Sequence, residues 1–317
     1  MCLSVAIHRS IQLPNQVYRF DPKTGAVRVA TDEVDECNGI AFSPDGKIAY
    51  IADSGAAGLS FDPTHPATIY AFDVDPQTQQ FRNRRVLAYI DTGVPDGLQV
   101  DSKGNVYAST ADGVQVYDPT GVLLGKIFIG TTSANNIFAG PGRLVILALS
   151  QIFLVEFAAA PALIELQEPS TPRISVDDMR SFSSFTFFLL SIIKAQCQRL
   201  PPQTMLVDVA GLAVLGNNGS FRSPTAPFNP TNATPPFFQV WDTRFLDILG
   251  SNASVRVIAD HNVGEFPFAH EAPIWDPNTD QVFFASSTGT PGVDHPANNQ
   301  FHNGEADLED YPKCTRL

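Results

Sequence analysis

The stretch NGIAFSPDGKIAYIADS, residues 38–54, contains two alternating apolar runs separated by the turn sequence Ser-Pro-Asp-Gly. Pro, Asp and Gly supply the backbone angles that a tight turn needs, so this stretch predicts a β-hairpin. Similar layouts recur in DGLQVDSKGNVYAST (96–110), NIFAGPGRLVILALS (136–150) and EAPIWDPNTDQVFFASS (271–287). No helical period of convincing length occurs before residue 158, and repeated short hairpins predict an all-β sandwich, barrel or propeller.

Each of these hairpins begins with an oxygen-bearing side chain and has its turn about five residues later. These four head residues are Asn38, Asp96, Asn136 and Glu271. The gaps of 58 residues between the first two and 40 between the next two suit one four-stranded blade per repeat. Equivalent positions of successive blades ring the channel of a propeller, so we expect the heads to converge. Two carboxylates and one or two amide oxygens would suit Ca²⁺ or another divalent cation.

Simpler interpretations exist for each of these residues. Asn-Gly and Asp-Gly are ordinary turn dipeptides, and a lone Glu271 is commonly a solvated strand end. For Asn136, the neighbouring Asn135 is equally available. His270, beside Glu271, is a candidate general acid or a partner of the carboxylate, with a partly exposed loop histidine as the alternative. The shared offset of Asn38, Asp96 and Glu271 favours the site.

The composition excludes several classes of protein. A net charge of −13 repels phosphate backbones, which argues against nucleic-acid binding and suits cation binding. The four cysteines are scattered, with no metal spacing and no disulfide framework. The longest apolar run, 185–193, is too short to span a bilayer. A serine hydrolase is disfavoured because the sequence lacks a G-x-S-x-G elbow.

Several long stretches resemble the gluconolactonase, senescence-marker and luciferin-regenerating family, in particular its secreted fungal lactonases. PNQVYRFDPKTGAVRVATD (14–32), CNGIAFSPDGKIAYIADSG (37–55) and VPDGLQVDSKGNVYASTADGVQVYDPTG (94–121) look like later blades of that family. FFQVWDTRFLDILGSNASVRVIAD (237–260) and AHEAPIWDPNTDQVFFASSTG (269–289) look like its beginning. The resemblance implies a six-bladed propeller that hydrolyses lactones with a divalent metal in its channel.

The resemblance also implies roles for individual residues. Glu271 matches the family's metal-binding Glu in an E-x-P-x-W motif, and Asn38 matches the Asn of P-N-G. Asp96 matches the Asp of D-G, a metal ligand also proposed as the catalytic base. Cys37 stands where the family usually has Pro, which loosens the turn before Asn38 without removing the ligand.

A segment in the middle of the chain has the layout of a secretion signal. MRSFSSFTFFLLSIIKAQCQ (179–198) has a basic start, a short apolar core and a small, polar end. Three sequons, at Asn218, Asn232 and Asn252, all follow it. Along the chain, the segments that resemble late blades therefore come first, the signal-like segment follows, and the segment that resembles an early blade comes last, which reverses the order of the family. A fusion of two truncated neighbouring genes accounts for this order better than a circular permutation, which would not need to keep the signal.

These observations predict late propeller blades at 14–157, a linker with the signal-like segment at 158–202, an irregular lead-in and early blade at 203–290, and an unpatterned tail at 291–317. Within the linker, the apolar stretch 182–194 is the most favoured helix. The propeller is expected to be incomplete or permuted. The expected activity is hydrolysis of a sugar-acid or related hydroxy-acid lactone with Ca²⁺; a non-catalytic propeller remnant or binding scaffold is the alternative. With its signal internal, the chain is expected to be cytoplasmic and to lack a stable membrane span, whereas its relatives look secreted.

Overall fold

The computed structural model describes residues 13–57, 61–162, 200–208, 227–260, 268–286 and 302–307. Within these ranges the fold is all-β, which confirms the predicted class, with one short α-helix, α1 (Phe245–Leu249), and one 3₁₀ turn at Gly55–Ala57. No helix in the described ranges is long and apolar enough to cross a membrane. The signal-like segment, with its expected helix, lies outside them.

The first four-stranded sheet, blade A, is an antiparallel meander in the order β3-β4-β5-β6. Its turn at residues 43–47 has Gly46 at φ 68°, the left-handed conformation that glycine adopts without strain. A two-stranded hairpin, β1-β2, packs on blade A. The bounds are β1 Val17–Phe20, β2 Val27–Thr31, β3 Cys37–Phe42, β4 Ile48–Asp53, β5 Thr68–Val74 and β6 Phe81–Tyr89.

The next two sheets use strands from both ends of the chain. Blade B has the order β7-β8-β9-β10-β15-β14, and blade C has the order β11-β12-β13-β16. The N-terminal strands are β7 Leu98–Val100, β8 Val106–Thr110, β9 Gly113–Tyr117, β10 Leu123–Phe128, β11 Asn135–Phe138, β12 Arg143–Ala148 and β13 Gln151–Glu156. The C-terminal strands are β14 Thr204–Leu206, β15 Phe237–Val240 and β16 Ser254–Asp260.

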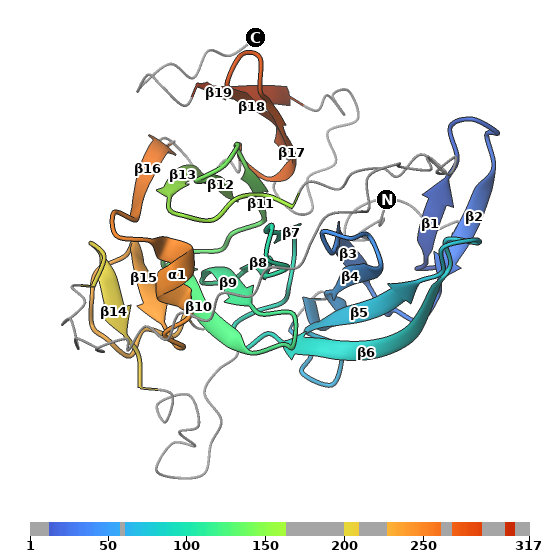
Figure 1. Ribbon diagram of the computed structural model, residues 1–317, viewed down its shortest axis with the longest axis horizontal. Helices are drawn as coiled ribbons and strands as arrows, with labels where there is room; N and C mark the ends of the chain where they lie inside the picture. The colour runs from blue at the N-terminus through green and yellow to red at the C-terminus, as the bar shows by residue number, and fades with distance from the viewer. Residues whose placement is uncertain are drawn as a thin grey trace, which may run out of the picture.

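Blade D is a three-stranded antiparallel sheet formed by β17 (Glu271–Asp276), β18 (Gln281–Ser286) and β19 (His302–Asp307). Figure 1 shows the four blades in an arc, with β3, β7, β11 and β17 towards its inner side. Contacts join β3 to β7, β7 to β11 and β11 to β17. The sheets are thus arranged as successive propeller blades, and no closed ring is formed by the described strands.

Apolar side chains fill the space between neighbouring blades. Tyr50 and Ile69 of blade A pack with Val106 of blade B. Strands β12 and β13 are buried on both faces, which explains why RLVILA and QIFLVE read as nearly continuous apolar runs. One face of blade C packs on blade B and α1, and the other packs on blade D.

Two parts of the fold differ from the expected block organisation. Residues 237–287 are expected to form at least one early blade, yet β15 extends blade B and β16 completes blade C. The reason is that β10 and β13 would otherwise leave unpaired edges. Strand β19 lies in the expected unpatterned tail, where HNGEAD has little strand propensity and pairs along β18 through its backbone.

Candidate metal and catalytic site

The head residues lie at the starts of the four inner strands, as the hairpin alignment predicts. Glu271 is the first residue of β17, and Asn38 is the second residue of β3. Asn136 is the second residue of β11, and Asp96 comes two residues before β7. Because these strands are neighbours in the arc, all four heads are on adjacent blades.

β-Bulges set the side-chain direction of two head residues, Asn38 and Glu271. The pairing of β3 with β4 shifts register between Cys37 and Ile40, and that of β17 with β18 shifts between Glu271 and Ile274. A bulge turns a side chain relative to the regular pleat, and such features are frequent beside functional sites. Cys37 itself is buried, with its Sγ 3.7 Å from the Gln16 carbonyl oxygen.

Glycines let the heads approach one another. A Cβ on Gly39, the residue after Asn38, would collide with the Asp96 carbonyl oxygen. A Cβ on Gly97, the residue after Asp96, would collide with the Asn135 side chain. Only glycine permits such close backbone packing, so the Asn-Gly and Asp-Gly dipeptides bring blades A, B and C together at this end.

Asp96 has the most perturbed chemistry in the cluster. Burial and the nearby Glu271 charge raise its pKa to about 7, while His270 and the Asn38 amide act in the opposite direction. Its Oδ1 is buried without a hydrogen-bond partner. A carboxylate oxygen that is desolvated and unpartnered is costly, so its occurrence here indicates a ligand site or a proton-transfer role.

Glu271 is held by its neighbours on blades C and D. Its Oε1 lies 3.1 Å from His270 Nδ1, and its Oε2 lies 3.5 Å from Asn135 Nδ2. The contact with Glu271 raises the pKa of His270, against the opposing effect of burial. His270 Nδ1 is thus in ion-pair contact with the Glu271 carboxylate, without the geometry of a hydrogen bond.

The two adjacent asparagines of β11 have different surroundings. Asn135 lies next to Glu271, and its Oδ1 accepts the backbone N–H of Asn136. Asn136 is fully buried, and its Nδ2 donates to Gly97 O and Ser109 Oγ, whereas its Oδ1 has no partner. The sequence left the choice between them open, and the structure puts Asn135 beside the carboxylate.

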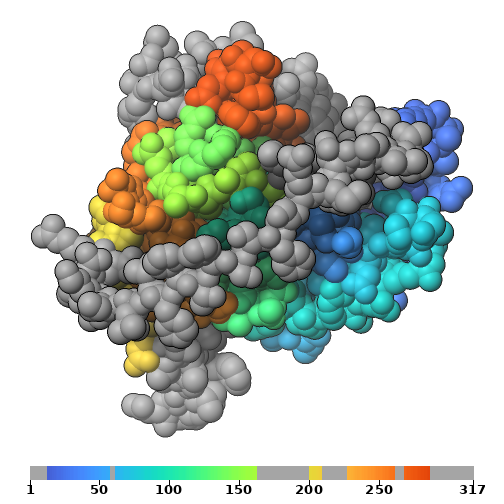
Figure 2. Space-filling view, viewed as in Figure 1, coloured from blue at the N-terminus to red at the C-terminus, as the bar shows by residue number. Residues whose placement is uncertain are grey.

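An ion pair that the sequence analysis missed docks blade D on blade C. Arg143 donates to both oxygens of Asp280 at 2.7 and 2.6 Å, and Trp275 Nε1 donates to the same carboxylate at 3.0 Å. Arg143 and Asp280 are 137 residues apart, so no local signal could have paired them. Their contact orients the hairpin on which Glu271 lies. Figure 2 shows residues 268–286, in orange-red, against the light-green segment of blade C.

The donor chemistry fits a hard divalent cation. Asp96 and Glu271 carry carboxylates, Asn38 and the two asparagines of β11 carry amide oxygens, and both Asp96 Oδ1 and Asn136 Oδ1 are buried without a partner. No three His, Cys, Asp or Glu side chains in the described part of the chain are grouped closely enough to hold a metal by themselves. Amide or water oxygens would have to complete the coordination.

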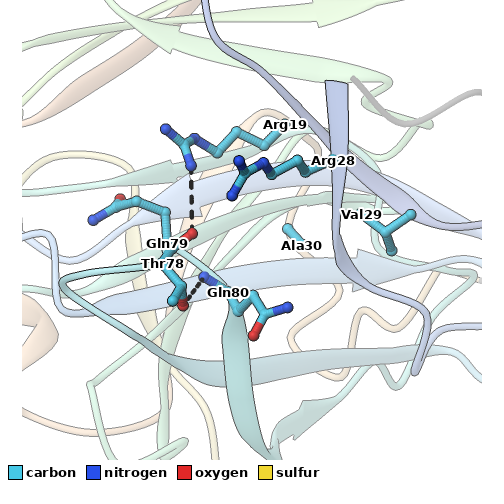
Figure 3. Close-up of a pocket in the computed structure, with 7 residues that line it drawn as sticks. All are labelled: Arg19, Arg28, Val29, Ala30, Thr78, Gln79 and Gln80. Atoms are coloured by element: carbon cyan, nitrogen blue, oxygen red, sulfur yellow. Dashed lines mark hydrogen bonds between the residues drawn. The ribbon is translucent and has the colours of Figure 1, made fainter. Parts of the chain in front are cut away.

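A separate surface pocket lies at the N-terminal end of the arc. It is lined by the β1-β2 hairpin and the turn between β5 and β6, and Figure 3 shows Arg19 and Arg28 side by side above Thr78 and Gln79. None of the head residues lines it. The polar cluster at the inner strands therefore remains the candidate site.

Comparisons with known proteins agree with the motifs. Residues 5–150 match the SMP-30/Gluconolactonase/LRE-like region. A lactonohydrolase of Aspergillus oryzae, oryH, is 37% identical over 143 residues, which cover 41% of this chain and 30% of the relative. The gluconolactonase of Zymomonas mobilis is 27% identical, covering 43% of this chain and 38% of its own length.

Among solved structures, a gluconolactonase from Xanthomonas campestris is 32% identical with a TM-score of 0.38, covering 44% of each chain. The chain spans about a third of the length of the curated relatives it matches. The match to the SMP-30/Gluconolactonase/LRE-like region covers residues 5–150, a little under half of the chain.

Proposed function

We propose that this chain hydrolyses a sugar-acid or related hydroxy-acid lactone at the cluster formed by Asp96, Glu271, Asn38 and Asn135. The observation that carries the proposal is the buried, unpartnered Asp96 oxygen among head residues contributed by four adjacent blades. The names of the relatives, lactonohydrolase, gluconolactonase and pentonolactonase, support the substrate class.

Asp96 and Glu271 would hold a divalent cation, for which Ca²⁺ is the favoured candidate, with Asn38 and an amide of β11 as further oxygen donors. When bound, such a cation polarises an ester carbonyl and makes water more acidic. The Asp96 carboxylate would accept the proton of the attacking water as the new C–O bond forms. The same proton would then be returned to the ring oxygen when the lactone C–O bond breaks, giving the open hydroxy acid.

The protonation state of Asp96 fits this role. A base works best when its pKa is near the working pH, and in the cation-free chain burial and the Glu271 charge raise the pKa of Asp96 to about 7. A neighbouring cation favours the ionised form of a carboxylate, which is the form that accepts a proton. His270, next to Glu271, would help to keep that carboxylate oriented.

The test is turnover of a panel of aldonolactones with Ca²⁺ and with chelator. Asp96→Asn should reduce kcat by ~10²–10⁴, the usual loss on removing a general base. Asp45→Asn, which changes an exposed turn carboxylate of blade A, is the matched control and should retain activity. Turnover that is insensitive to chelator and to Asp96→Asn would refute the proposal.

A binding scaffold is the second candidate, because the described strands form no closed ring around the cluster. Calcium binding that depends on Asp96 and Glu271, without turnover of any lactone in the panel, would favour it.

A further inference from the structure

We infer that Ser54 and Asn136, one from each blade beside β7, form a clamp on the backbone around Asp96. Both are positioning residues: they act on the carboxylate through the peptide groups on either side of it. The inference rests on the proposed function for the role of Asp96, and its geometry stands on the contacts of the two side chains.

Ser54 holds the chain on the N-terminal side of Asp96. It follows the last residue of β4 in blade A, is 4% exposed, and donates its hydroxyl to the Pro95 carbonyl oxygen at 2.6 Å. Ser54 is itself fixed, because its N–H donates to the Glu36 carbonyl. The buried Asp53 carboxylate next to it accepts the N–H groups of Asp35, Glu36 and Gly55.

Asn136 holds the chain on the C-terminal side. Its Nδ2 donates to the Gly97 carbonyl oxygen at 3.3 Å and to Ser109 Oγ at 2.9 Å. Ser133 Oγ lies 2.9 Å from the same Ser109 hydroxyl, so three side chains without exposed surface form one buried network. This network joins the start of β11 in blade C to the end of β8 in blade B.

The backbone hydrogen bonds of the segment complete the clamp. The Asp96 N–H donates to the Ser109 carbonyl, and the Gly97 N–H donates to the Ala134 carbonyl. The peptide groups around Asp96 are thus tied to three blades, while Asp96 Oδ1 has no partner. Such an arrangement fixes a carboxylate in position without using that oxygen in a protein contact, as a preorganised site requires.

The clamp uses the Nδ2 group of Asn136, whereas a direct metal ligand would use its unpartnered Oδ1, and one substitution separates the two roles. Asn136→Asp keeps an oxygen that could bind a cation but removes the N–H donor to Gly97. A ligand role predicts unchanged or tighter Ca²⁺ binding for this variant, whereas the clamp predicts weaker binding. Ser54→Ala tests the other side of the clamp without placing a charge in the core, and Ser54→Thr should restore the hydrogen bond.

The experiment measures each variant in the full chain in two ways: amide hydrogen exchange of the peptide covering residues 96–100 in chelator, and Ca²⁺ affinity by titration calorimetry. Ser54→Ala, Asn136→Ala and Asn136→Asp should each speed exchange in that peptide and weaken Ca²⁺ binding ~10–100-fold, the usual loss when groups supporting a ligand are removed. Ser43→Ala removes a buried hydroxyl from the far turn of blade A and is the control that should change neither.

Exchange equal to that of the Ser43→Ala control in both Ser54→Ala and Asn136→Ala would overturn the clamp. If Asn136→Asp binds Ca²⁺ with wild-type affinity, Asn136 is not part of the clamp and acts as a metal ligand. Faster exchange in the variants of a chain that binds no divalent cation and turns over no lactone even as wild type would support the clamp and refute the proposed function, so the two failures are distinguishable.

Discussion

The two carboxylates of the candidate site are supported in different ways. Asp96 lies in blade B between blades A and C, and residues of all three blades hold its backbone through hydrogen bonds. Glu271 lies in blade D at the end of the described arc, and its hairpin depends on the contacts of Asp280 with Arg143 and Trp275. Its side chain is 46% exposed, so solvent screens its charge more than that of Asp96. Burial therefore sets the pKa of Asp96, whereas the docking of blade D on blade C sets the position of Glu271.

The largest expected effect is on the pH dependence of stability, and it comes from Asp96, the more buried of the two carboxylates. The pKa of Asp96 is raised from its ordinary value to about 7 in the fold, so the native state keeps a proton that the unfolded state has lost. The stability that Asp96 contributes is therefore fully present below about pH 4. It is lost as the pH rises to about 7, by at most ~1.4 kcal/mol of unfolding free energy per pH unit.

Chemical denaturation in chelator at pH 5 and pH 8 measures this loss. Asp96→Asn should remove much of the difference, and the remainder belongs to other groups such as His270. A pH difference in Asp96→Asn as large as in the wild type would show that Asp96 is not protonated in the fold.

The docking contact should have an intermediate effect. Arg143→Met leaves the partly buried Asp280 without its charged donor, which should lower the free energy of unfolding by ~1–3 kcal/mol. Because Glu271 is on the same hairpin, Ca²⁺ affinity should fall as well. Calorimetric titration of Arg143→Met measures this, and wild-type affinity would mean that Glu271 is placed independently of the ion pair.

The smallest effect is expected for an exposed ion pair on the outer strands of blade A. Arg85 lies 2.9 Å from Asp73, and both side chains are nearly half exposed. Arg85→Met should change the free energy of unfolding by no more than ~0.5 kcal/mol and leave Ca²⁺ affinity unaltered. A larger loss in a denaturant titration would show that a surface pair contributes as much as the docking contact.

Local patterns were sufficient to predict the hairpins and the positions of the heads. Alternating runs and turn residues fix β3-β4 and β7-β8, and the register of each hairpin places Asn38 and Asp96 near the start of an inner strand. The choice between Asn135 and Asn136 could not be made in this way. Neighbouring residues of a strand point to opposite faces, so only the docked position of β11 decides which one meets Glu271.

Long-range pairings were also beyond the sequence. Ser254 pairs with Glu156, and β16 thereby closes blade C from a segment almost a hundred residues later. Nothing in SVRVIAD specifies that partner, because many strand edges would accept it. Two of the sequon asparagines, Asn232 and Asn252, are exposed, while Asn218 lies outside the described residues.

The central claim is that Asp96 and Glu271 share one cation across blades B, C and D, and thermal melting with Ca²⁺ or with chelator tests it most directly. Bound Ca²⁺ converts the repulsion between the carboxylates into attraction, so it should raise the melting temperature. At a hundredfold excess of Ca²⁺ over Kd, the free energy of unfolding should increase by ~2.7 kcal/mol. Asp96→Ala and Glu271→Ala should each abolish the rise. Equal melting temperatures of the wild type in the two buffers would contradict a shared site, and a rise that survives Glu271→Ala would limit the site to the N-terminal blades.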